Sequence, residues 1–173
     1  LKISNSSVRF RSEGPNSDLM SIGITGLNLE ADQIGNGVST RLQLTGAVEL
    51  SLMQGGELSL LAATLKEDVT VTLDQALLPG AIEATVALVV DRVGGVFSEF
   101  ANNRLDLTAK LGEGRLDPVS LTISKSGQGL GKLEVSGPYD AAAGTAELDF
   151  SATGINQNLL NQFQDLLGFR FGP

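Results

Sequence analysis

The side chains best suited to chemistry in this sequence are three carboxylates near its C-terminal end, Asp140, Glu147 and Asp149. Glycoside hydrolysis uses two carboxylates about 5–10 Å apart in a cleft. Glu147 and Asp149 are two residues apart and are expected on one face of a strand, which satisfies the distance. That face is expected to be solvated and not enclosed in a cleft. We therefore interpret the pair as part of a wetted outer surface, with no catalytic role.

Other catalytic and metal-binding arrangements are missing from the sequence. It contains no histidine and no cysteine, so zinc sites, haem, iron–sulfur clusters, thiol nucleophiles and histidine-based triads are excluded. Serines and threonines are plentiful, but they have no histidine or paired lysine to act as a base. The patterns GxSxG, SxxK and GxxxxGK[ST] do not occur, and acidic loops with EF-hand spacing are absent. We predict no enzymatic activity, no metal site and no cofactor.

The net charge of −8 and the pI near 4.4 restrict the partners. Binding to nucleic acid needs a basic stripe that displaces counterions from phosphates, and the 12 lysines and arginines are scattered singly. A nucleic-acid partner is therefore not expected. Electrostatic attachment to anionic lipid headgroups is disfavoured for the same reason.

The beginning of the sequence carries no targeting signal. No run approaches the roughly 18 apolar residues of a membrane-spanning helix. The chain opens with Leu1 and at once shows a strand pattern, without a charged region followed by an apolar one. We expect a segment of a longer chain, whose other parts could hold a signal peptide or a membrane anchor.

Alternation of apolar and polar residues dominates the sequence, and this pattern indicates half-buried strands. Gly- and Pro-containing turn sequences separate the strands, with a spacing of about 10–14 residues that leaves no room for crossover helices. We therefore predict a mostly β fold, an antiparallel meander of at least eight strands. The clearest alternating segments are 1–10, 42–45, 48–52, 69–74, 105–111, 119–124, 133–136 and 146–151. The predicted turns are 112–114, 126–129 and 137–140.

One glycine interrupts the alternation in the N-terminal part. Gly26 lies between the pair Ile22 and Ile24 and the pair Leu27 and Leu29, and it shifts the apolar phase by one residue. A β-bulge produces such a shift, because it inserts one extra residue into one strand. We predict a bulge at this position.

Two segments show helical spacing. A strand over 82–90 is expected to lead into a short helix over 91–101, although two consecutive glycines weaken it. A short amphipathic C-terminal helix is predicted over 156–167, capped by Asn156 and ended by Gly168. Its apolar stripe consists of Leu159, Leu160, Phe163, Leu166 and Leu167.

The apolar face of the predicted sheet is aliphatic, since aromatic residues make up only 5% of the chain. One interpretation is the core of a sandwich-like sheet closed by a second sheet. The other is a curved β-groove whose apolar face holds lipid acyl chains. Periodicity does not separate them, because a stacked sheet and a lipid satisfy the same hydrophobic demand. The candidate lipid-contacting residues are Leu105, Leu107, Leu111, Val119, Leu121, Ile123, Leu133, Val135, Leu148 and Phe150.

The stretch from Leu130 to Phe163, LGKLEVSGPYDAAAGTAELDFSATGINQNLLNQF, resembles the AsmA-like family of bacterial envelope proteins. The family pattern G-x-L-x-x-S-G-x-Y-D-x-x-x-G is followed by a strand and then by Gly-Ile-Asn-hydrophobic-Leu-Leu. The corresponding residues here are Gly131, Leu133, Ser136, Gly137, Tyr139, Asp140, Gly144, Gly154, Ile155, Leu159 and Leu160. The opening LKISNSSVRFR, followed by LNLEADQIGNG, is also similar to a strand pattern of the family.

This resemblance implies a repeating β-groove, polar outside and apolar inside, with no catalytic residues to carry over. Members of the family are similar to bridge-like lipid transporters and take part in phospholipid movement and outer-membrane assembly. The expectation is a single β-groove domain over 1–173 in the periplasm, whose partners are phospholipid acyl chains and which is anchored to a membrane by parts outside this segment. The alternative is a structural or adhesion scaffold module with a closed, dry core.

Overall fold

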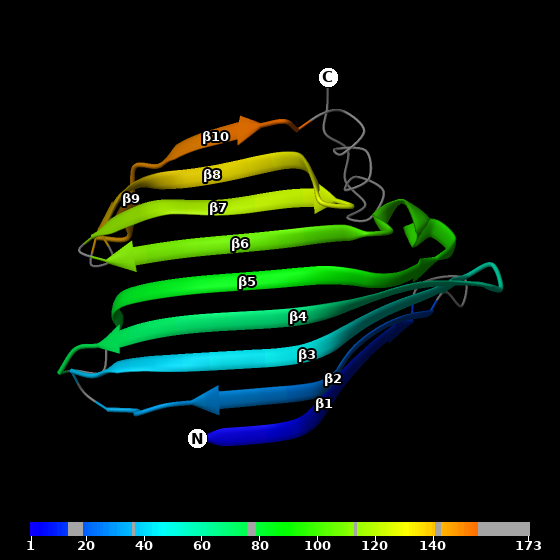
Figure 1. Ribbon diagram of the computed structural model, residues 1–173, viewed down its shortest axis with the longest axis horizontal. Helices are drawn as coiled ribbons and strands as arrows, with labels where there is room; N and C mark the ends of the chain where they lie inside the picture. Colours follow the sequence, from blue (N-terminus) through cyan, green and yellow to red (C-terminus); the bar gives the residue numbers. More distant parts are fainter. Residues whose placement is uncertain (14–18, 36, 76–78, 113, 141–142, 156–173) are drawn as a thin grey trace.

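The computed structural model describes residues 1–13, 19–35, 37–75, 79–112, 114–140 and 143–155, and it folds them mainly into one antiparallel sheet (Figure 1). Strands β1 to β8 each pair with the next strand in sequence, and β10 pairs with β8 at the far edge. The strands are β1 (Lys2–Glu13), β2 (Leu19–Ala31), β3 (Ser39–Gln54), β4 (Glu57–Leu73), β5 (Pro79–Gly94), β6 (Asn103–Gly112), β7 (Arg115–Lys125), β8 (Gln128–Asp140), β9 (Thr145–Ala146) and β10 (Asp149–Thr153). The predicted antiparallel meander of at least eight strands is confirmed.

The sheet is open, because β1 and β10 lie at opposite edges and do not pair with each other. Figure 1 shows β1 and β2 curving away from the line of β5 to β8. Several strands exceed the usual length of about 5–6 residues. The two alternating segments 42–45 and 48–52 belong to the single strand β3, which continues through Gly46 without a break.

The predicted bulge at Gly26 is confirmed. The register between β2 and β3 shifts between Thr25 and Asn28, and Gly26 has a positive φ of 59°. Asn28 secures the irregular backbone, since its Nδ2 donates to the Gly26 carbonyl at 2.9 Å and its Oδ1 accepts the Asn5 N–H at 3.1 Å. The bulge changes the phase of β2, so that Ile24 and Leu29 lie on the same face of the sheet.

Two of the three turn predictions are confirmed, and the third is wrong. The chain reverses between β6 and β7 and again at Ser126 and Gly127, but 137–140 belongs to β8. Gly137 is needed there for a close approach, because a β-carbon on it would lie 3.1 Å from the carbonyl carbon of Glu147. The glycine therefore allows the segment between β9 and β10 to lie close against β8, and β8 continues to Asp140.

The predicted segment 91–101 is only partly helical. Strand β5 continues to Gly94, and a 3₁₀ helix, η2, spans Gly95–Phe100. Ser59 Oγ accepts the N–H of Val96 at 3.1 Å, which ties the first turn of η2 to β4. The predicted C-terminal helix over 156–167 lies outside the described residues.

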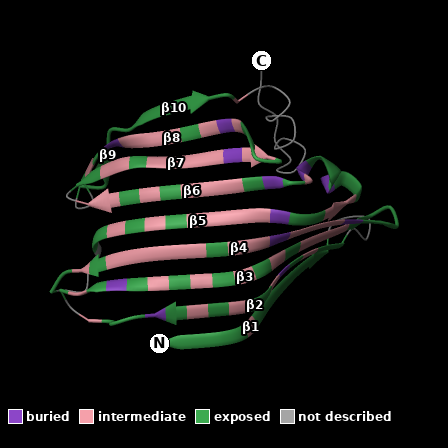
Figure 2. Cartoon of the chain, in the orientation of Figure 1, coloured by how far each residue is buried: buried purple, intermediate pink, exposed green. Residues whose placement is uncertain are grey.

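Few residues of the described sheet are fully buried. The buried apolar residues are Ala31, Ala63, Val90, Phe97, Phe100 and Ile123. Figure 2 shows intermediate exposure over the central strands and exposed ribbon along β1 and β10. Within the described part of the chain, no second sheet lies against this one, so the sandwich interpretation finds no partner layer there.

Candidate functional site

Strand alternation and register together define two faces of the sheet. We call the face that carries Leu107 the apolar face, and the opposite one the polar face. A central row of directly paired residues crosses the apolar face from β2 to β8. Its members are Leu29, Leu44, Glu67, Val86, Leu107, Leu121 and Leu133.

The candidate residues on β6, β7, β8 and β10 lie together on the apolar face. The register pairs Leu105 with Ile123, and it places Leu107, Leu121 and Leu133 side by side on three strands. A further row consists of Val119, Val135 and Phe150, while Leu111 lies opposite Ile82 and Leu116. Leu148 lies in the segment before β10, outside the strands.

Exposure rises from the interior of this surface towards its edge. Ile123 is only 3% exposed, whereas Leu133 is 39% and Phe150 75% exposed. Central members such as Leu107 and Leu121 are half-buried. An aliphatic surface that stays partly open in this way can bind an apolar ligand.

Sequence reasoning missed the part of the apolar face that β2 to β5 contribute. Leu44 and Val86 continue the same row beyond the predicted residues. It also missed Glu67, although extending the alternation of Val69 and Val71 back by one step would have placed it on this face.

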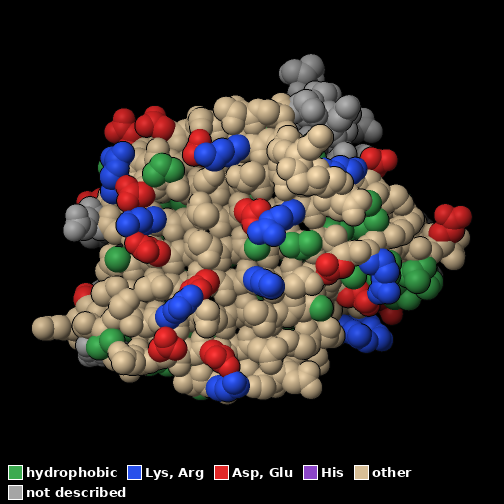
Figure 3. All heavy atoms as spheres, in the orientation of Figure 1, with side chains coloured by type: hydrophobic (Ala, Val, Ile, Leu, Met, Phe, Trp, Pro, Cys, Tyr) green, Lys and Arg blue, Asp and Glu red, His purple; other side chains and the backbone are tan. Residues whose placement is uncertain are grey.

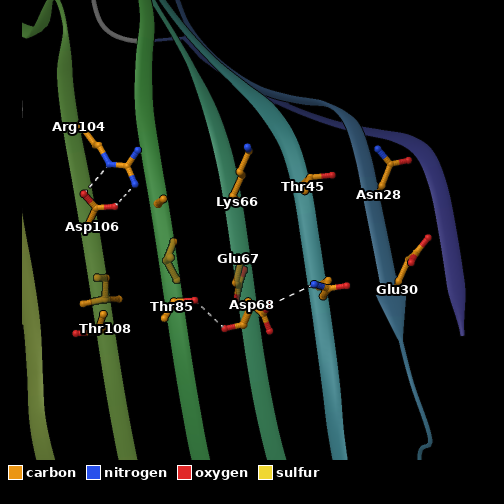
Figure 4. Close-up of a pocket in the computed structure, with 14 residues that line it drawn as sticks. Asn28, Glu30, Thr45, Lys66, Glu67, Asp68, Thr85, Arg104, Asp106 and Thr108 are labelled. Carbon is orange, nitrogen blue, oxygen red and sulfur yellow. Dashed lines mark hydrogen bonds and ion pairs between the residues drawn. The ribbon is translucent and has the colours of Figure 1, made fainter.

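Glu67 is the one charged side chain in the central row. It lies between Leu44 on β3 and Val86 on β5, with Leu65 and Val69 on the same side of β4. It is half-buried, and it forms no hydrogen bond or ion pair with any other described residue. Figure 4 views the polar face and draws Glu67 behind the ribbon of β4, on the other side from Asp68.

The polar face pairs its charges across and along the strands. Figure 3 shows lysines and arginines beside acidic residues over the face turned to the viewer. Lys110 Nζ lies 2.8 Å from Glu83 Oε1 on the opposite strand, and Arg104 Nε donates to Asp106 Oδ2 at 2.7 Å. A hydrogen bond from the Arg41 guanidinium lowers the pKa of Asp68.

A shallow hollow of about 590 Å³ lies on the polar face over β2 to β6 (Figure 4). Asp68 and Asp106 line it and are already paired with arginines, and Thr85 Oγ1 donates to the Asp68 carbonyl at 3.4 Å. No group of three or more acidic residues suited to a metal ion occurs among the described residues. The three carboxylates considered above, Asp140, Glu147 and Asp149, are exposed to solvent, which agrees with their interpretation as part of an outer surface.

Helix η2 covers one end of the apolar face. Ser59 belongs to this face, since it pairs with Leu52, and the first turn of η2 rests on it. Phe97 and Phe100 of η2 are buried. Asn103 at the start of β6 is 2% exposed, and its Oδ1 has no hydrogen-bond partner in the described part of the chain. This end of the face is therefore more enclosed than the edges at β1 and β10.

None of the helices in the described ranges has the length and hydrophobicity needed to cross a bilayer. Comparison with protein-family models, with curated proteins and with solved structures finds no significant match to this chain. The resemblance to the AsmA-like family therefore rests on the motif residues alone.

Proposed function

We propose that this chain binds and conducts lipid acyl chains along the apolar face, without catalysis. In this proposal it is a segment of a periplasmic envelope protein that takes part in phospholipid transport and outer-membrane assembly. The observation that carries the proposal is the central row, in which every residue except Glu67 is aliphatic and all share one face of an open, single-layer sheet. No described layer covers that row.

The physical mechanism is passive. An acyl chain that moves from water onto this face gains about 0.8 kcal/mol for each CH₂ group that it buries. Except at Glu67, the central row offers no charged side chain that would fix one position of the chain. Weak positional preference suits movement, because an acyl chain can then slide along the row without breaking a specific contact.

The open architecture favours this function over a scaffold with a dry core. A closed sandwich places a second sheet about 10 Å from the first, and its inner side chains are withdrawn from water. Here Leu133 and Phe150 keep 39% and 75% exposure. Contiguous exposed apolar surfaces of this kind mark interaction sites in soluble proteins.

The motif residues between Gly131 and Leu160 support the envelope assignment. They resemble the AsmA-like pattern, and the members of that family act between the two membranes of the bacterial envelope. Attachment to a membrane would then come from parts outside this segment. The partners in this proposal are phospholipid acyl chains.

Native mass spectrometry and organic extraction of the purified chain test the proposal. We expect co-purifying phospholipid, released on extraction and rebound when phospholipid vesicles are added. A chain that carries no lipid, and that takes none up from vesicles, would contradict the proposal and favour a scaffold role.

A further inference from the structure

Glu67 breaks the chemical uniformity of the apolar face at its centre. Its direct cross-strand neighbours are Leu44 and Val86, and its neighbours along β4 on the same face are Leu65 and Val69. Several acids of the polar face form ion pairs with basic residues, for example Glu83 with Lys110 and Asp106 with Arg104. Glu67 has no such partner among the described residues.

Water can solvate this carboxylate while the face is open. A bound acyl chain would remove that water, and an ionised carboxylate without a partner is costly to bury. An uncharged hydrocarbon would therefore be a poor occupant of the position directly over Glu67, although it suits the aliphatic rest of the row. An occupant that brings its own positive charge would compensate Glu67 and keep the burial of the acyl chain favourable.

We propose that Glu67 binds the protonated primary amine of an amphiphile, such as a lipid with an ethanolamine headgroup. This inference rests on the proposed function and names the class of its ligand. A primary ammonium donates up to three hydrogen bonds, and charge-assisted hydrogen bonds to a carboxylate are stronger than neutral ones. The amine contacts Glu67, and the acyl chain lies over Val86, Leu107, Leu121 and Leu133.

The dimensions of the sheet fit this arrangement. From β4 to β8 there are four strand spacings of about 4.8 Å, or roughly 19 Å in all. A bilayer core of about 30 Å contains two acyl-chain lengths, about 15 Å each. The row from Glu67 to Leu133 is therefore long enough to carry one acyl chain, and the phosphate and glycerol that join this chain to the amine can stand above the open face, in water.

The test offers the full chain an equimolar mixture of two lipids with identical dioleoyl chains, one with an ethanolamine and one with a glycerol headgroup. The bound lipids are extracted and quantified by mass spectrometry. We expect the ethanolamine lipid to be enriched about tenfold, and this enrichment to be lost in Glu67→Gln. Glu67→Leu, which completes the aliphatic row, should behave in the same way.

The matched control is Glu83→Gln, which removes the same charge from the polar face, where Glu83 pairs with Lys110. The net charge of −8 disfavours the anionic glycerol lipid in the parent chain, and Glu67→Gln and Glu83→Gln each remove one negative charge from it. Since this general electrostatic effect is the same in both variants, the comparison between them is decisive. Equal enrichment in both variants, or no enrichment in the parent chain, would overturn the role of Glu67. Failure of the parent chain to bind either lipid would instead overturn the proposed function, and this inference with it.

Discussion

Gly95 lies directly against Ser59, so that a β-carbon at position 95 would be 2.8 Å from the Cβ of Ser59. The φ of Gly95 is +64°, a conformation that costs other residues roughly 1–2 kcal/mol. The contact lets η2 fold back onto the apolar face, and Val96 then donates its N–H to Ser59 Oγ. The position of η2 thus depends on the absence of a side chain at this residue.

We expect Gly95→Ala to lower the free energy of unfolding by roughly 2–4 kcal/mol, because strain in the backbone adds to the displacement of η2. Urea unfolding measures this loss. Gly127→Ala is the control, since Gly127 also has a positive φ but a β-carbon added there would meet no atom within 4 Å. It should lose only about 1 kcal/mol. Equal losses in the two variants would show that the contact with Ser59 is unimportant.

Truncation of Phe97 to alanine should destabilise the protein by about 3 kcal/mol, because Phe97 is only 4% exposed. The neighbouring Val96 is 63% exposed, so Val96→Ala should change stability by about 0.5 kcal/mol or less. Thermal unfolding followed by circular dichroism compares the two. A small effect of Phe97→Ala would mean that η2 does not pack against the sheet in solution.

Leu107→Glu introduces a charge at the centre of the apolar face and should abolish lipid co-purification. We expect the free energy of unfolding to fall by only about 1 kcal/mol, because the carboxylate can reach water on an open face. Thr108→Glu places the same charge on the polar face, where Thr108 is exposed, and should leave lipid binding intact. Lipid extraction and thermal unfolding are the measurements.

Two results together would contradict the open face: global unfolding of the Leu107→Glu variant, and the absence of lipid from the purified parent protein. A charge buried in a closed core costs several kcal/mol, a large share of the ~5–15 kcal/mol stability of a domain. The two architectures therefore give opposite results for the same variant.

Asp68 should make the stability of the sheet sensitive to acid. The hydrogen bond from Arg41 lowers the pKa of Asp68 below its ordinary value of 3.8 in the folded state. Its stabilising contribution is therefore complete above that value and disappears as the pH falls through the lowered folded-state pKa. The stability difference between the parent and Asp68→Asn should shrink between pH 7 and strongly acidic pH in urea unfolding. A difference that grows on acidification would contradict this linkage.

The alternation of the sequence is sufficient to predict which residues share a face. Three leucines on neighbouring strands pair directly across the sheet: Leu107, Leu121 and Leu133. Short turns make these strands antiparallel neighbours, and side chains alternate between the two faces of a strand, so the apolar residues of each strand lie on the same face. The same pattern does not distinguish an open sheet from a sandwich, since both bury one face of each strand. That distinction depends on layers that alternation does not encode.

Two local features were not predicted correctly from the sequence, and each has a physical cause. The segment 137–140 has the composition of a turn, but it belongs to β8, and Gly137 allows the backbone at Glu147, between β9 and β10, to approach closely. The position of Glu67 on the apolar face was not predicted, because a charged residue where the alternation calls for an apolar one suggests that the strand has ended. In the structure β4 continues on both sides of Glu67. The residues that share the apolar face on β6 to β8 are therefore predictable from the sequence, whereas the candidate residues do not include those that β2 to β5 contribute to this face.

The pairing of each strand from β1 to β8 with its successor in sequence makes the sheet effectively one-dimensional. In such an array, stability is a sum of nearest-neighbour interfaces, and the outermost units have only one interface each. The sheet should therefore open from its margins by fraying, while the middle strands exchange their amide hydrogens most slowly. A lipid that crosses the apolar face spans many of these interfaces at once, so its binding would couple strands that otherwise unfold separately and sharpen the unfolding transition.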